Sequence, residues 1–388
     1  MTKLRVAIFI ISLIVVGTIG TAVFYYARGY RLDGETGSIE PRGLLVANSD
    51  PNGAQVIIDG ELETATNATV SLAPGTYKVV IKKEGFIPWE KQLTIAKEEV
   101  TQIDVTLFTS APSLTALGFS GAVNPVPNED FSKVAYAVPP GEDNLEKEGL
   151  WVIEATNLPI GFSREPRRIT NGDLTQASWE WSFDSRQILL TTELGAYLLD
   201  AGVFTPSYER VNVTLTVDEI KQEWEEEKQL KLESKLAGLV DEIEKILAEN
   251  ATDIAFSPDD KRILYTASSS ATIPEGVVVQ LPGSSTQKQI RDIKPDKKYV
   301  YDVGEDRNFE IAEANQITHW FPTSAHLVLP NENSISIIDY DGTNKKDIYT
   351  GAYTYPYAFP YSSTSKLLIL TNFGAQEDFG ELYSLNLR

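Results

Sequence analysis

The sequence predicts a mainly β protein, with an N-terminal transmembrane helix, a small β-sandwich and a five- or six-bladed β-propeller that carries a helical insertion. Three observations predict this fold class. A long uncharged apolar run lies near the N-terminus. Alternating apolar and polar residues follow it, as in half-buried strands. A strand–turn–strand unit then recurs along the rest of the chain, whose 388 residues are enough for two or three domains.

Composition argues against several classes of function. The chain has 34 basic and 55 acidic residues and a formal net charge of -21. Nucleic acids and anionic lipid surfaces attract basic proteins, so we expect neither as the main partner. The chain has no cysteine and only two histidines. We therefore predict no disulfide, no metal site, no cofactor and no catalytic residue.

The uncharged run covers residues 6–26 and predicts a membrane-spanning helix. At about 1.5 Å rise per residue, its length matches a hydrocarbon core of roughly 30 Å. Tyr25 and Tyr26 suit the aromatic belt at a membrane interface. A cleaved signal peptide is the alternative, but its apolar region is usually about 7–15 residues long and ends at a small-x-small site. We therefore expect residues 1–31 to form a short cytoplasmic stub and an uncleaved anchor.

The orientation of this anchor depends on a slight charge bias. Lys3 and Arg5 precede the run, and Arg28 and Arg31 follow it. Basic residues on both sides favour neither orientation strongly. The remaining sequence is acidic, free of cysteine and typical of soluble β domains. We expect the N-terminus to be cytoplasmic and the C-terminal domains to lie outside the cytoplasm.

After a linker at residues 32–42, alternation predicts a β-sandwich over residues 43–108. Tyr77, Val79 and Ile81 alternate with polar residues, for example. A period of two with one apolar face indicates half-buried antiparallel strands. Turn sequences separate these strands at Ser49–Gly53, Asp59-Gly60 and Ala73–Gly75.

These residues resemble the PEGA domain, a small surface-associated β-sandwich. The resemblance rests on Ser49–Ala54, Val56–Gly60, Leu72–Tyr77, Lys83–Phe86 and Trp89. The tetrad that names the family reads Pro51-Asn52-Gly53-Ala54, with Asn52 where glutamate is usual. The resemblance implies an envelope or surface role and brings no catalytic residue. A plain spacer domain is the alternative.

Residues 110–388 contain a repeat, and its clearest copy is residues 254–265, with the sequence IAFSPDDKRILY. Each copy has an aromatic residue or proline, a polar turn, a long side chain and an apolar strand, and a second strand follows it. A single unit cannot bury both faces, so the array must close on itself. Four further stretches align with the clearest copy, 181–190 and 320–329 without gaps, and 127–136 and 359–369 with small insertions.

This repeat resembles the TolB-type β-propeller. The Ser-Pro-Asp-Gly-Lys turn of that family is best kept at Ser257–Lys261, where Asp260 replaces glycine. The resemblance implies five or six blades, each a four-stranded sheet, around a central channel. The last unit stops right after Leu387 and lacks an outer strand. We expect residues 114–119 to supply that strand and close the ring.

The repeat spacing is interrupted by an insertion at residues 216–250, which separates Ile188 from Ile263. Thr216–Glu219 reads as a capping box, and apolar residues then recur at helical spacing. We expect a helical hairpin divided at Gly238. A helix pair that only covers a blade surface is the alternative to a binding edge. The candidate partner-binding residues are Ile220, Trp224, Leu236 and Ile243.

An aromatic-rich stretch at residues 349–361 is a second candidate site. Tyrosine has an apolar face and a polar tip, which suit a sugar or a peptide in an exposed groove. Packing between blades is the alternative. The candidate ligand-binding aromatics are Tyr353, Tyr355, Tyr357 and Tyr361.

The two histidines and one acidic loop are weaker candidates. We expect His319 to be structural, and we expect His326 to be solvated because it aligns with Arg262 just before a strand. Asp339–Asn344 resembles a calcium loop at first sight. Its glycine stands at the fourth place rather than the sixth, and no distal glutamate completes a ligand set, so we expect a hairpin turn.

Together these features predict a membrane-anchored, extracytoplasmic and non-catalytic binding or scaffold protein of the cell envelope. Its propeller would be presented to a protein or glycan partner. The alternative is a propeller-based hydrolase or lyase that acts on envelope polymers. Such an enzyme would need carboxylates, histidine or a metal clustered in the channel.

Overall fold

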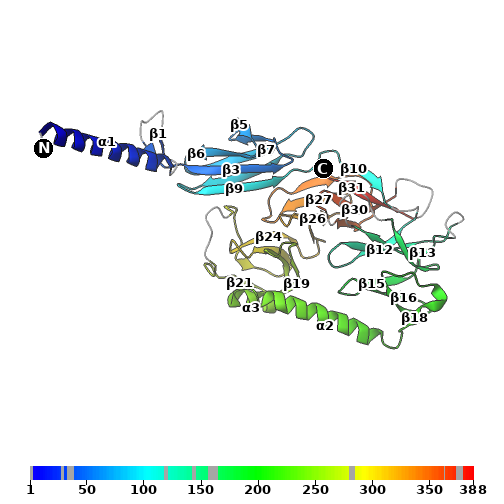
Figure 1. The fold of residues 1–388 in the computed structure, drawn as a ribbon. Helices are drawn as coiled ribbons and strands as arrows, with labels where there is room; N and C mark the ends of the chain where they lie inside the picture. Colours follow the sequence, from blue (N-terminus) through cyan, green and yellow to red (C-terminus); the bar gives the residue numbers. More distant parts are fainter. Residues whose placement is uncertain are drawn as a thin grey trace. The chain divides into compact units, whose positions relative to one another are not determined.

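The computed structural model describes residues 3–27, 30–32, 39–117, 121–141, 146–155, 165–278, 285–361, 363–372 and 379–388. The chain divides into two compact units (Figure 1). Unit 1 comprises Met1–Leu107 and Gln280–Lys288, and unit 2 comprises Phe108–Val279 and Gln289–Arg388. The predicted flanking residue Arg28, most of the predicted linker and the end of the predicted closing strand lie outside the described residues.

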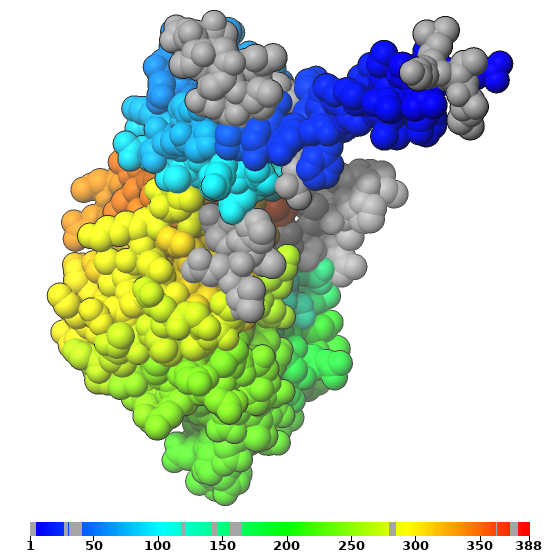
Figure 2. Space-filling view, turned by 90° about the vertical axis from the view of Figure 1, so that its left-hand side faces the viewer, coloured from blue at the N-terminus to red at the C-terminus, as the bar shows by residue number. Residues whose placement is uncertain are grey.

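The apolar run forms helix α1 (Lys3–Ala27), as predicted. Residues Arg5–Tyr26 have a mean hydropathy of 2.6, and no part of this segment is buried. Figure 2 shows the side chains of α1 in dark blue. By length and composition the helix can cross a membrane, and a signal sequence has the same two properties.

The β-sandwich of unit 1 has two sheets, with strand orders β6-β3-β9 and β5-β4-β7-β8. Alternate residues of both sheets meet in one core, which contains Leu45, Val56, Ile81, Ile95 and Val105. A two-stranded pair, β1 (Arg31–Leu32) with β2 (Ile39–Glu40), precedes it. The strands are β3 (Gly43–Asp50), β4 (Gln55–Ile58), β5 (Glu61–Ala65), β6 (Ala68–Leu72), β7 (Gly75–Lys82), β8 (Trp89–Ile95) and β9 (Val100–Thr106).

One strand pair of this sandwich differs from the antiparallel prediction. β9 runs parallel to β3, with Leu44 opposite Val100 and Asp50 opposite Thr106. A parallel neighbour needs a long connection between the two strands. Strands β4 to β8 supply that connection. The chain passes through β4 and β5 of the second sheet, returns to the first sheet as β6, and crosses the second sheet again as β7 and β8 before β9. The predicted Asp59-Gly60 hairpin turn is present, and both residues have the positive φ that a two-residue turn favours.

Unit 2 contains five antiparallel four-stranded sheets in its described residues, and we call them blades 1 to 5. They correspond to the five repeat copies in chain order. Blade 1 is β11 (Val123–Pro127), β12 (Lys133–Val138), β13 (Gly149–Glu154) and β14 (Arg167–Asn171). Blade 2 is β15 (Ser178–Trp181), β16 (Gln187–Thr192), β17 (Gly195–Asp200) and β18 (Val211–Asn212).

The other blades follow the same order of strands from the inside of the ring outward. Blade 3 is β19 (Ala251–Phe256), β20 (Arg262–Ala267), β23 (Lys297–Asp302) and β24 (Arg307–Glu313). Blade 4 is β25 (His319–Trp320), β26 (His326–Pro330), β27 (Ile335–Asp339) and β28 (Lys346–Tyr349). Blade 5 is β29 (Ala358–Pro360), β30 (Lys366–Thr371), β31 (Glu381–Asn386) and β10 (Ser113–Ala116).

Blade 5 confirms the predicted closure of the ring. Its outer strand β10 comes from the N-terminal end of unit 2 and pairs antiparallel with β31, with Leu114 opposite Leu385. Blade 5 therefore joins the two ends of the array. The fold class predicted from the sequence, with five blades, is confirmed.

Two repeated contacts hold neighbouring blades together. The indole N–H of Trp181 in blade 2 donates to Val126 O in blade 1 at 2.9 Å, and Trp320 in blade 4 donates to Ala255 O in blade 3 at 2.9 Å. These two tryptophans occupy the same position of the repeat. The aromatic residue of the repeat thus bonds its inner strand to that of the preceding blade.

The second repeated contact uses the long side chain of the repeat. Lys133 Nζ in blade 1 donates to Ser185 O in blade 2 at 2.9 Å. Arg262 Nη1 in blade 3 donates to Ser324 O in blade 4 at 3.1 Å. Both acceptors lie in the turn between the first two strands of the next blade. The junctions between blades 1 and 2 and between blades 3 and 4 are therefore built alike.

The junction between blades 2 and 3 is different. The aromatic position of blade 3 is Phe256, which has no N–H to donate, and the long side chain of blade 2 is Gln187. The insertion lies at this junction as α2 (Val217–Leu236) and α3 (Asp241–Asn250). In Figure 1 the two helices run along the lower edge of unit 2, from the strands of blade 2 toward those of blade 3.

The helical hairpin has the predicted boundaries but not the predicted cap. α2 begins after Thr216, and the two helices are separated near Gly238. The Thr216 hydroxyl does not bond to the first turn of α2, because it donates to Val213 O at 3.3 Å. Two acidic residues in the first turn, Asp218 and Glu219, favour the helix N-terminus through its dipole.

Candidate binding site

The C-terminal part of the insertion is packed into unit 2. Leu236, Ile243 and Leu247 are buried against Ile263 and Tyr265 of blade 3. The opposite face of blade 3 packs against blade 4. The helices therefore cover the face of blade 3 that is turned toward blade 2. This placement leaves the predicted partner-binding residues Leu236 and Ile243 no exposed surface for a partner.

Charged side chains of α2 connect it to both blades. Lys221 pairs with Glu180 on the inner strand of blade 2. Lys235, at the other end of the helix, pairs with Asp260 in the first turn of blade 3 at 2.6 Å, and its ammonium lies 4.9 Å from the ring centroid of Phe256. Asp260 and Phe256 are the repeat residues that lack the usual contact at this junction. α2 thus replaces the repeated contacts with its own.

The N-terminal part of the insertion borders a pocket, which we call the α2 pocket. Its volume is about 330 Å³, which is near the lower end of the range for small-molecule sites. One wall is α2, and the other walls are the inner strands and first turns of blades 1 and 2. The lining residues are Val126, Pro127, Glu129, Trp179, Glu180, Trp181, Ser182, Phe183, Lys221, Trp224, Glu225 and Lys228.

The helix side of the α2 pocket is a polar stripe with one indole. Lys221, Trp224, Glu225 and Lys228 follow the spacing i, i+3, i+4 and i+7, which places them on one face of a helix. Trp224 is half-buried, and its indole N–H makes no hydrogen bond to any residue that the structure describes. Of the predicted partner-binding residues, Trp224 is the one that reaches the pocket.

The blade side of the α2 pocket is aromatic. Trp181 and Phe183 are half-buried there, beside the fully packed Trp179. The Trp181 N–H is already used at the blade junction, and Lys231 lies 4.9 Å from the centroid of the Phe183 ring. Two aromatic side chains therefore face the polar stripe of α2 across the pocket.

The four predicted tyrosines do not form a single groove. Tyr361 is 2% exposed and lies in the core shared by blades 1 and 5, with Tyr357 packed against that core. Tyr353 donates its hydroxyl to Asn331 O, and burial raises its pKa to about 12. Tyr355 is 42% exposed. The structure therefore uses most of this aromatic stretch for packing between blades.

Three aromatic rings from different blades are in contact, those of Phe131, His319 and Phe359. The rings of Phe131 in blade 1 and His319 in blade 4 have centroids 5.0 Å apart, and Phe131 stacks on Phe359 of blade 5 at 6.4 Å. Blades 1 and 4 are not neighbours in the ring, so the contact of Phe131 with His319 connects two blades that are otherwise separated by blade 5. Desolvation, with a smaller repulsion from Lys298, lowers the pKa of His319 to about 4.

The depressed pKa of His319 predicts an acid-sensitive fold. His319 is half-buried and desolvated, so its pKa is lower when folded than when unfolded, and unfolding takes up a proton between pH 6.5 and about 4. Stability is then lost as the pH falls through this window, by about 1.4 kcal/mol per pH unit at most. His319→Phe should flatten this dependence, as measured by urea unfolding at pH 7, 5.5 and 4.5. An equal loss of stability with falling pH in the wild-type protein and the His319→Phe variant would contradict the role given to His319.

His326 corrects the sequence prediction. It is 4% exposed rather than solvated, because its ring packs edge-on against Phe108. Its Nδ1 lies 2.8 Å from the Thr323 hydroxyl, and its Nε2 lies 3.6 Å from an Asp339 oxygen. The aligned residue Arg262 is also largely buried, in an ion pair with Asp302. The alignment between the two positions was sound, and both positions are inside the fold.

The acidic loop at Asp339–Asn344 forms a turn, as predicted. Gly342 has a φ of +79°, and the Asp341 carboxylate accepts hydrogen bonds from the Thr343 amide and hydroxyl. Asn344 donates to Asp339 at 3.1 Å. The loop carboxylates are thus bonded within the turn. Across the part of the chain that the structure describes, no group of three or more histidine and acidic residues is placed to hold a metal.

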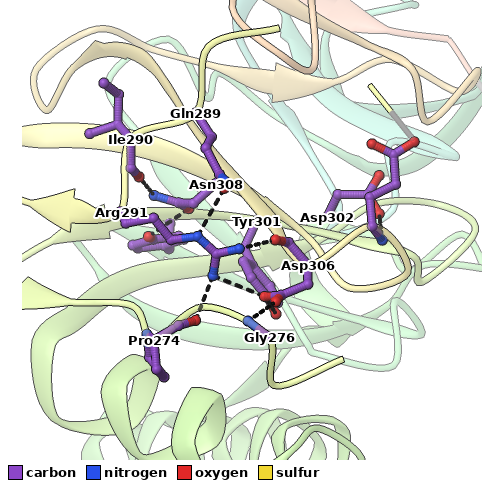
Figure 3. A network of polar contacts seen from close by, with 11 residues as sticks. Pro274, Gly276, Gln289, Ile290, Arg291, Tyr301, Asp302, Asp306 and Asn308 are labelled. Carbon is purple, nitrogen blue, oxygen red and sulfur yellow. Dashed lines mark hydrogen bonds and ion pairs between the residues drawn. The ribbon is translucent and has the colours of Figure 1, made fainter. Parts of the chain in front are cut away.

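A buried ion pair in blade 3 is absent from the sequence predictions. Figure 3 shows Arg291, Tyr301 and Gly276 converging on Asp306. Arg291 Nη1 lies 3.0 Å from Asp306 Oδ1, the Tyr301 hydroxyl donates to the same oxygen at 2.9 Å, and the Gly276 amide donates to Oδ2 at 3.0 Å. The Asp306 side chain is fully buried. Arg291 and Gly276 both lie between β20 and β23, so this network fixes the connection between these two strands.

Comparison with known proteins supports the module in unit 1. Residues 42–110 match the family model of the PEGA domain, which confirms the predicted resemblance. That match covers less than a fifth of the chain. No curated protein matches the chain.

Comparison with solved structures also gives matches, each of low identity. A putative TolB from Agrobacterium tumefaciens is 12% identical and covers 66% of this chain and 72% of its own, with a TM-score of 0.22. TolB from Acinetobacter baumannii is 12% identical, and the match covers 95% of this chain and 68% of the TolB chain, with a TM-score of 0.23. The acylaminoacyl peptidase of Pyrococcus horikoshii is 14% identical, and the match covers 69% of this chain and 38% of the peptidase chain, with a TM-score of 0.22. These scores carry no conclusion, and the five-bladed architecture rests on the strand pairing itself.

Proposed function

We propose that the chain is a membrane-anchored, extracytoplasmic protein of the cell envelope that binds a protein or glycan partner through its propeller and catalyses no reaction. The observation that carries this proposal is the exposed apolar helix α1 ahead of two β units. The anchor fixes the location, the PEGA-like sandwich acts as a spacer, and the propeller offers the binding surface.

The hydroxyl groups inside α1 support its role as an anchor. Ser12, Thr18 and Thr21 donate to the carbonyl oxygens of Ile8, Ile14 and Gly17 at 2.8–2.9 Å. A polar group in a hydrocarbon core is costly unless it is bonded within the segment. These three side chains therefore suit a lipid environment without a partner helix.

The chemistry of the two β units supports the external location. The chain has no cysteine and a net charge of -21, so it neither needs a reducing compartment nor favours an anionic cytoplasmic membrane surface. The PEGA domain match is consistent with a surface or envelope role. These points support an orientation with the N-terminus in the cytoplasm.

The surroundings of His319 support binding rather than catalysis. Its ring contacts the rings of Phe131 and Phe359, whereas a propeller enzyme would need clustered reactive groups. The depressed pKa of His319 follows from burial against aromatic rings rather than from a carboxylate partner. A partner can reach the propeller at the α2 pocket, where aromatic and charged side chains meet.

Protease treatment of intact cells that produce the full chain tests the location. We expect the C-terminal units to be digested while a short N-terminal fragment stays with the membrane after sodium carbonate extraction. Full protection of both units would refute the extracytoplasmic placement. Release of the intact chain by carbonate would refute the anchor. A cytoplasmic marker protein, which should stay undigested, serves as the control for cell integrity.

A further inference from the structure

We propose that the α2 pocket is a subsite for a neutral oligosaccharide. This inference rests on the proposed binding function, and it names the class of ligand and the place where it binds. The argument depends on three properties of the pocket: its incomplete packing, its unpaired indole and its balance of charges.

The packing of α2 changes along its length. Near its C-terminal end, Leu232 and Leu236 belong to the core that the hairpin shares with blade 3. Toward its N-terminus, the stripe that faces the blades consists of Lys221, Glu225 and Lys228 around Trp224. A helix used only for packing would fill this space with aliphatic side chains, because protein interiors are close-packed. Here the polar stripe leaves about 330 Å³ unfilled.

Trp224 supplies a flat apolar face with a hydrogen-bond donor at its edge. Its indole is half-buried, lies in the wall of the pocket and has no hydrogen-bond partner among the described residues. Trp181 and Phe183 present further ring surface from the blade side. A sugar ring has an apolar face of C–H groups and an edge of hydroxyls, so it can stack on an indole and accept its N–H.

The charges of the pocket favour a neutral polar ligand. Lys221 and Glu180 neutralise each other in an ion pair. The other charged side chains of the lining are the acidic Glu129 and Glu225 and the basic Lys228. A phosphate, sulfate or uronate would meet two carboxylates, and the net charge of -21 adds repulsion at longer range. A metal cation would meet two lysines. Sugar hydroxyls both donate and accept, so carboxylates and ammonium groups can all serve as their partners.

Other classes of ligand fit less well. A purely apolar ligand would have to desolvate five charged side chains of the lining. An extended peptide can be recognised by adding a strand to a sheet edge. In this pocket α2 lies against the inner edge of blade 2, where such a strand would pair. A short neutral saccharide needs no strand edge and matches the size of the space.

Isothermal titration calorimetry on the full chain tests the inference. The protein is held in an amine-oxide detergent, which has no sugar head group. The probes are three neutral tetrasaccharides, made of β1,4-linked N-acetylglucosamine, β1,4-linked glucose and α1,4-linked glucose. A tetramer of galacturonic acid is the anionic comparison. We expect at least one neutral probe to bind, to be recovered uncleaved, and to bind more tightly than the galacturonate.

Two variants locate the binding site. Trp224→Ala should weaken binding of the neutral probe by about tenfold or more, because a central tryptophan is a frequent hot spot. Alanine is also a good helix former, so α2 should remain folded. Tyr208→Ala removes an aromatic side chain that is 82% exposed and outside the pocket, and it should leave the affinity unchanged. Equal melting temperatures of the three proteins control for folding.

The outcomes separate this inference from the proposed function. Absence of binding by all three neutral probes, or equal affinity of the Trp224→Ala variant, would overturn the saccharide subsite. Tighter binding of the galacturonate would overturn it as well. None of these results would alter the membrane location measured by protease and carbonate. Cleavage of a bound probe would instead refute the non-catalytic function and leave the saccharide class standing.

Discussion

Replacing Arg291 with alanine is expected to destabilise unit 2 by about 3–5 kcal/mol. The substitution leaves the fully buried Asp306 carboxylate without its cationic partner, although Tyr301 and Gly276 still donate to it. Desolvation then penalises the charged carboxylate, which has no access to water. The loss also frees the Pro274 carbonyl, to which Arg291 donates at 2.6 Å. Urea unfolding followed by tryptophan fluorescence measures the change.

Two further variants identify the unpaired charge as the cause. The double variant Arg291→Ala with Asp306→Ala removes that charge and should recover part of the stability. Lys297→Ala breaks ion pairs with Glu310 and Glu313 on the surface of the same blade, and should cost less than about 1 kcal/mol. A double variant less stable than Arg291→Ala would show that packing, rather than charge, explains the loss.

Replacing Leu247 with alanine is expected to cost about 2–5 kcal/mol. Leu247 is 1% exposed and anchors α3 in the core shared with blade 3. The substitution opens a cavity at the junction between blades 2 and 3, which lacks the contacts that hold the similar junctions. The expected result is a lower urea midpoint, with helix content reduced in circular dichroism if the hairpin detaches.

An exposed leucine on the other helix is the control for this prediction. Leu230 lies on α2 and is 66% exposed, so Leu230→Ala should change stability by less than about 0.5 kcal/mol. If Leu247→Ala were as stable as this control, the hairpin would not be an anchored part of the ring. The interpretation of α2 and α3 as a replacement for blade contacts would then be wrong.

The sequence was most informative where a local pattern determines structure. Residue alternation and the five repeat copies predicted the strands, because each pattern reports which face of a strand is buried. The missing outer strand of the last unit predicted β10, because an incomplete sheet needs a partner. Even the replacement of glycine by Asp260 is accommodated, since that residue keeps the φ of +57° that the turn requires.

The predictions failed where distant segments meet. The parallel pairing of β9 with β3 depends on a path through a second sheet, which alternation does not report. Arg291 and Asp306 lie outside the repeat pattern, so no spacing marked them as partners. The α2 pocket needs side chains from blade 1, blade 2 and the insertion at once. Helical periodicity identified Trp224, but only tertiary packing separates it from the buried Leu236 and Ile243.

The pairing of β10 with β31 has a consequence for biosynthesis. β10 is the first strand of unit 2 along the chain, whereas its partner β31 is the last. The ring can therefore be completed only after all five blades have been synthesised. Until then β10 has no partner strand. The earlier blades form an open array, and the sheets at both of its ends are exposed.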